Sequence, residues 1–119
     1  QWAYLVGTRF LHGDYDGAVT AADHCKDAIT NIAAWRAAAL FWQGRIPEAQ
    51  QELRRFFDLV KAHWKGDQTP DDDIIIRWFL HNFPVRRRSD WERLRDGVHG
   101  AGAPFVPHDE RRPLHIAQG

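Results

Sequence analysis

The sequence predicts an all-α fold of about six helices, arranged as helical hairpins. Apolar residues recur every three to four positions along most of the chain, which is the period of one helix face. A Gly-x-apolar-x-x-Ala pattern also occurs twice, at residues 13–18 and 44–49, each time between two apolar stretches. We expect hairpins at about residues 1–30, 31–63 and 71–103, which form one domain over 1–104, and an extended tail at 105–119.

The first hairpin is expected to begin with a helix from Trp2 to His12, whose apolar residues have helical spacing. Gly13 ends this helix, because glycine adopts the left-handed cap conformation without a Cβ clash. A second helix follows from Tyr15 to about Ala28 and carries one apolar stripe.

The second hairpin starts near Asn31, a good N-cap residue. Residues Ile32–Trp42 are apolar almost all round, so we expect this helix to be covered on several sides. Gly44 ends it, and Pro47 stands in the first turn of the next helix, where its missing N–H costs nothing. The next helix has an apolar stripe and an opposite polar face that we expect to be solvated. That polar face consists of Glu48, Gln50, Gln51, Glu52, Arg54 and Arg55.

The third hairpin is less regular. Asp71–Asp73 precede Ile74–Phe83, and acidic residues there suit the positive end of a helix dipole. The β-branched run in this segment is also compatible with a short strand, but its helical surroundings favour a helix. Pro84 stops the segment, and Ser89 is expected to cap a last helix that ends near Ala101.

The two glycine turns resemble those of the tetratricopeptide repeat, a family that places a glycine and, five residues later, an alanine between its two helices. The resemblance covers about residues 1–60. The sequence departs from the family in its period of 31 rather than 34 residues, in Thr30 at the position of the closing proline, and in Arg36 at a normally apolar position. The resemblance implies an α-solenoid that winds as a right-handed superhelix.

Further segments resemble one bacterial subset of this family. Residues 40–49 are similar to its glycine turn, and residues 83–86, 90–94 and 97–104 are similar to its C-terminal ending, with Ala103 in place of a leucine. In that subset the repeats lie at the C-terminus of class III adenylate/guanylate cyclases and of winged-helix transcriptional regulators. The resemblance therefore implies a module of a bacterial signalling or regulatory protein. Because the chain contains no methionine, we expect it to be a piece of a longer protein. The resemblance implies that a cyclase or DNA-binding domain lies upstream.

The resemblance also implies a concave partner groove lined by the first helix of each hairpin. An apolar groove left in water would be an unusually large exposed patch. We therefore expect a protein partner, a second copy or the chain's own tail from Phe105 to Ile116 to cover it. By position, the groove residues are Ala3, Gly7, Phe10, Asn31, Ala34, Arg36, Ala38 and Phe41.

Arg36 is the only charged residue in its otherwise apolar helix, and a buried charge needs a partner. The favoured interpretation is an ion pair with Asp23, Asp27 or Glu52, or a side chain whose stem lies on the helix while its head reaches water. The alternative is that Arg36 faces the binding groove.

One basic cluster offers a second hypothesis, in which the domain senses a phosphate-bearing ligand or a nucleic acid. Nearby acidic residues offset its charge, and sixteen basic residues balance sixteen acidic ones in the whole chain, which argues against nucleic-acid and membrane-surface binding. The cluster comprises Arg86, Arg87, Arg88, Arg93 and Arg95.

No motif in the sequence predicts catalysis. The seven histidines lack metal-ligand spacing, and no phosphate-binding glycine loop is present. Cys25 lies on an apolar stripe and is expected to be a small buried residue; as the only cysteine it fits a reducing compartment. No apolar run approaches the roughly 18 residues of a membrane span. We expect a cytoplasmic, non-enzymatic module for protein–protein contact or self-association, without metal or cofactor.

Overall fold

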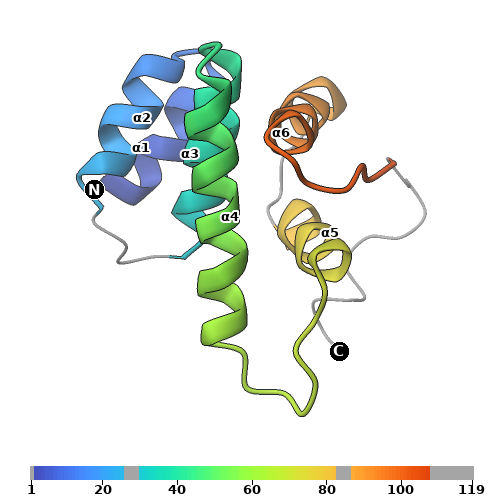
Figure 1. The fold of residues 1–119 in the computed structure, drawn as a ribbon. Helices are drawn as coiled ribbons and strands as arrows, with labels where there is room; N and C mark the ends of the chain where they lie inside the picture. The colour runs from blue at the N-terminus through green and yellow to red at the C-terminus, as the bar shows by residue number, and fades with distance from the viewer. Residues whose placement is uncertain (1, 26–29, 83–86, 108–119) are drawn as a thin grey trace.

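The computed structural model describes residues 2–25, 30–82 and 87–107, and over these residues the chain forms six α-helices and no strand (Figure 1). The predicted all-α class and the number of helices are therefore confirmed. In these ranges no helix combines the length and the apolar character that crossing a bilayer requires. The helices are α1 (Trp2–Leu11), α2 (Tyr15–Asp23), α3 (Asn31–Trp42), α4 (Ile46–Ala62), α5 (Asp72–Asn82) and α6 (Arg88–Gly100).

The two predicted glycine turns have the same geometry. Gly13 has a φ of 81°, its amide donates to the carbonyl of Phe10 at 2.9 Å, and the amide of Asp14 donates to the carbonyl of Arg9 at 2.8 Å. The same two bonds recur around Gly44, whose φ is 84°, both at 2.9 Å. These bonds form the Schellman motif, which satisfies the last carbonyl groups of a helix.

The position of the alanine, five residues after the glycine in each motif, has a structural reason. Ala18 in α2 and Ala49 in α4 are both fully buried, where a small side chain lets the second helix of each hairpin approach the first. Each alanine amide also donates to the carbonyl of the N-cap residue, Asp14 or Arg45, at 2.9 Å. The repeated sequence pattern thus corresponds to a repeated turn and helix start.

Several helix ends differ from the prediction. Asn31 is the first residue of α3 rather than its cap, and Thr30 is the N-cap without a side-chain bond. Helix α6 begins at Arg88, so Ser89 lies inside its first turn. The reason is that Arg87 has an extended backbone and its carbonyl already accepts the amide of Trp91 at 3.0 Å, which places the N-cap two residues earlier than predicted. Helix α2 ends at Asp23, with His24 as its C-cap, and so is shorter than the predicted helix to about Ala28, a residue that itself lies outside the described ranges.

The isoleucine run is helical, as favoured, and lies in α5. Asp71 caps this helix, because its Oδ1 accepts the amide of Ile74 at 3.1 Å. Asp72 and Asp73 stand in the first turn, where they oppose the positive end of the helix dipole. Ile75 and Ile76 are buried while Ile74 is exposed, which is the pattern of a helix with one packed face.

Helices α5 and α6 cross the long helix α4 steeply: in Figure 1 they are seen nearly end-on beside the upright α4. Helix α6 packs closely on α3, because Gly97 leaves no side chain between them; a Cβ there would lie 2.8 Å from the Cβ of Ala38. Leu94 and Val98 of α6 are fully buried in the same core as Phe56 and Phe79. The stacking of three hairpins into a right-handed solenoid stays a prediction.

Candidate functional site

Three residues of the predicted partner groove are closed to solvent. Phe10, Ala34 and Ala38 are each 0% exposed. Helix α6 covers this face: Gly97 lies against Ala38, and the guanidinium of Arg93 lies 5.5 Å from the ring centroid of Phe10. The prediction of an accessible groove is therefore wrong at these three positions.

The other predicted groove residues are partly accessible. Ala3, Gly7, Asn31 and Phe41 are half-buried, and Phe41 borders Gly100 of α6. The sequence correctly indicated that the apolar face needs a cover, but within the described residues that cover is α6 rather than the tail. Residues 108–116 of the proposed tail cover lie outside the described residues.

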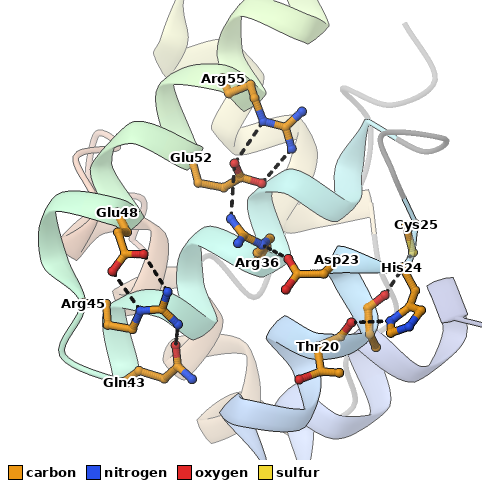
Figure 2. A network of polar contacts seen from close by, with 11 residues as sticks. Thr20, Asp23, His24, Cys25, Arg36, Gln43, Arg45, Glu48, Glu52 and Arg55 are labelled. Atoms are coloured by element: carbon orange, nitrogen blue, oxygen red, sulfur yellow. Dashed lines mark hydrogen bonds and ion pairs between the residues drawn. The ribbon is translucent and has the colours of Figure 1, made fainter.

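Arg36 has the acidic partners that the sequence favoured. Its Nε donates to Asp23 Oδ1 at 2.9 Å, and its Nη1 lies 3.5 Å from Glu52 Oε1 (Figure 2). The third candidate partner, Asp27, lies outside the described residues. The side chain of Arg36 is 25% exposed, so Arg36 is neither buried alone nor free in a groove. It joins α3 to the end of α2 and to the middle of α4.

Glu52 is the centre of this network and was predicted to be solvated. Instead it is 6% exposed, and its two oxygens accept from Arg55 Nε at 3.0 Å and Nη2 at 2.8 Å. Its position in the sequence explains the error. Glu52 is three residues after buried Ala49 and four before buried Phe56, so it lies at the edge of the apolar face. Two guanidinium groups then compensate the cost of burying its charge.

A charged hollow of about 490 Å³ opens beside this network along α4. At its edge, Arg45 donates two hydrogen bonds to the carboxylate of Glu48, from Nε at 2.8 Å and from Nη2 at 2.6 Å (Figure 2). The hydrogen bond from Arg45 lowers the pKa of Glu48, so this carboxyl stays ionised. The hollow is lined by Arg36, Glu48, Gln51, Glu52, Arg54, Arg55 and Asp58.

A second hollow of about 280 Å³ lies on the other side of Arg54, between α4 and the ends of α5 and α6. Its floor contains the buried side chains of Leu53 and Phe57. Arg54 lines both hollows and so forms the ridge between them. Arg54 belongs to the polar face predicted for this helix, but no feature of the sequence distinguishes it from its polar neighbours.

The predicted basic cluster is not one surface. Arg93 points inward. Its Nη1 donates to the carbonyl of Phe10 at 2.9 Å and to the hydroxyl of Tyr15 at 3.0 Å. Its Nη2 donates to the carbonyl of Leu11 at 2.9 Å and to Asp90 Oδ1 at 2.8 Å. Burial opposes its charge, but the hydrogen bonds to Tyr15 and Asp90 outweigh this and raise the pKa of Arg93. Arg93 is therefore an anchor of α6 on α1.

The other members of the cluster are also divided. Arg95 donates to Asp96 at 2.9 Å and lies 4.6 Å from the ring centroid of Phe105. Arg88 pairs with Glu92 at 3.1 Å, and Arg87 is exposed at the start of α6. Arg86 lies outside the described residues. The described members thus face different partners, which corrects the prediction of one basic patch.

Three of the described histidines and the cysteine have local partners. Nδ1 of His24, His63 and His81 lies 2.9 Å from the carbonyl oxygen four residues earlier in each case. Cys25 is half-buried and its Sγ donates to the carbonyl of Ala21 at 3.5 Å. Burial raises the pKa of the Cys25 thiol, the opposite of what a nucleophile needs. Over the described ranges, no three His, Cys, Asp or Glu side chains gather as metal ligands would.

Comparisons of the chain with protein-family models, curated proteins and solved structures found no match. The resemblance to the tetratricopeptide repeat therefore continues to rest on the residues of the two turns.

Proposed function

We propose that this chain is a non-catalytic interaction module that binds a protein partner, or a second copy of itself, through the exposed face of α4. The observation that carries the proposal is the charged hollow along this 17-residue helix. It is open at the surface, while the apolar face that the family resemblance would offer to a partner is occupied by α6.

The ion pairs among the residues that line the hollow support this proposal. Arg36, Glu52 and Arg55 hold one another in fixed positions between α3 and α4, and the Arg45–Glu48 pair fixes the edge. Polar groups that are already ordered lose little conformational entropy when a partner binds. A charged lining also selects a partner by charge arrangement more than by apolar area.

The two matching glycine turns support a TPR-like helical-hairpin scaffold, a type of scaffold whose surfaces serve in protein contact. The resemblance places such a module in a cytoplasmic bacterial signalling or regulatory protein. The second hypothesis, a ligand or nucleic-acid sensor at the arginine cluster, gains no support, because Arg93 and Arg95 are committed to contacts within the chain.

A photo-crosslinking amino acid at Gln51 tests the proposal, because Gln51 is exposed and lines the charged hollow. The matched control carries the same group at Gln68, which is exposed in the segment between α4 and α5. After irradiation of cells that produce the chain, we expect a discrete protein adduct from position 51 only. No adduct at position 51, or the same adducts from both positions, would contradict the proposal.

A further inference from the structure

Two opposite charges on the outer face of α4 have no direct contact partner among the described residues, although Lys61 attracts Asp58 at longer range. Arg54 and Asp58 are exposed, and neither has a hydrogen bond or ion pair there. They are four residues apart, but an acidic residue placed N-terminal to a basic one is the better order for such a pair, and here the order is reversed. The neighbouring charged residues form ion pairs within the chain: Glu48 binds Arg45, and Lys61 binds Asp72 at 2.8 Å.

From this arrangement we infer that α4 pairs antiparallel with α4 of a second copy of this chain, through reciprocal Arg54–Asp58 ion pairs. This inference rests on the proposed function and names its partner. Four residues of helix span about 6 Å along the axis. A two-fold axis midway between the two side chains places Arg54 of each copy opposite Asp58 of the other, which is the geometry of an isologous dimer.

The rest of the face is compatible with this register. The same two-fold axis sets Lys61 opposite uncharged Gln51, so no like charges meet there. It also brings Trp64, which is 45% exposed just beyond the end of α4, to the level of exposed Glu48 near the start of the other helix. The chain has no net charge at neutral pH, so no overall repulsion opposes the approach of two copies.

The pairing is expected to be weak and sensitive to salt. One helix face of this length buries less area than the roughly 1,000 Å² that stable interfaces exceed, so the dimer forms only at high protein concentration. Exposed ion pairs are screened by salt. This behaviour is the opposite of apolar self-association, which would survive high salt.

Analytical ultracentrifugation over a concentration series tests the inference with charge-reversal variants. For the native chain we expect an average mass that rises toward the dimer at low salt and returns to the monomer at high salt. Arg54→Asp alone and Asp58→Arg alone each place like charges opposite one another, so each is expected to stay monomeric. Both residues are exposed, so circular dichroism should show unchanged helix content.

The decisive measurements are the equimolar mixture of the two single variants and the double variant with both reversals. In each of them opposite charges face one another again, so we expect association to return. A native chain that is monomeric at every concentration, or single variants that associate as the native chain does, would overturn the inference. The proposed function is judged separately, because an adduct between position 51 and a different protein would still support it.

Discussion

Glu52 lies at the centre of the polar network between α3 and α4. It is the buried charged residue among those described, and both of its oxygens accept bonds from Arg55 while Arg36 approaches from α3. Glu52→Gln keeps the shape but removes the negative charge that two guanidinium groups share. We expect a loss of about 1–3 kcal/mol in the free energy of unfolding, the usual cost of leaving buried polar groups without their partners.

The control for this variant is Glu48→Gln in the same helix. Glu48 also binds an arginine, but its side chain is 53% exposed and its ion pair is screened by water. The midpoint of urea unfolding should therefore fall clearly for Glu52→Gln and hardly move for Glu48→Gln. Equal shifts for the two variants would show that the buried network adds nothing beyond a surface ion pair.

At the scale of elements, the contact between α3 and α6 depends on a glycine inside a helix. Gly97→Ala would place a Cβ 2.8 Å from the Cβ and 3.0 Å from the Cα of Ala38, and backbone atoms cannot move aside cheaply. Alanine favours helix over glycine by about 1 kcal/mol, so a variant without this contact would become more stable. We expect Gly97→Ala to be destabilised instead, as measured by thermal unfolding.

Gly7 provides the matched comparison, because it also lies inside a helix, α1, and a Cβ there would meet only the ring of Trp35 at an ordinary 3.9 Å. Gly7→Ala should therefore keep or raise the melting temperature. If Gly97→Ala were as stable as Gly7→Ala, the close approach of α6 to α3 would not be a constraint on the fold.

Local signals predicted the elements well. Gly13 and Gly44 end their helices because the left-handed conformation they adopt is costly for other residues, and this cost can be read from the sequence. The site was predicted only in part. The Arg36 ion pair followed from the need to compensate a buried charge. Glu52 was assigned to the solvated face because it lies at the edge of the apolar stripe, where a charged residue continues the polar pattern. The crossing of α6 over α3 depends on contacts distant in sequence, which no local pattern encodes.

At the scale of the whole molecule, Arg93 joins the two ends of the described chain. From α6 it donates to the last carbonyl groups of α1, Phe10 and Leu11, and to the hydroxyl of Tyr15. The bond to Leu11 serves a carbonyl at the helix end, and the bond to Phe10 is a second one to a carbonyl that already accepts the Gly13 amide. Together they hold the cover of the apolar face in place. We therefore expect α1 and α6 to unfold together while this anchor is intact.

Arg93→Lys tests this role, because an ammonium group cannot reach the four acceptors that the planar guanidinium spans. We expect a loss of about 1–3 kcal/mol in the free energy of unfolding, as for other buried charge-assisted hydrogen bonds. Hydrogen exchange should show the amides of α1 and α6 losing protection together. Arg87→Lys, at an exposed position just before α6, should leave both unchanged. Loss of protection in α6 alone would mean that α1 does not depend on the anchor, and that the helices of this chain open separately.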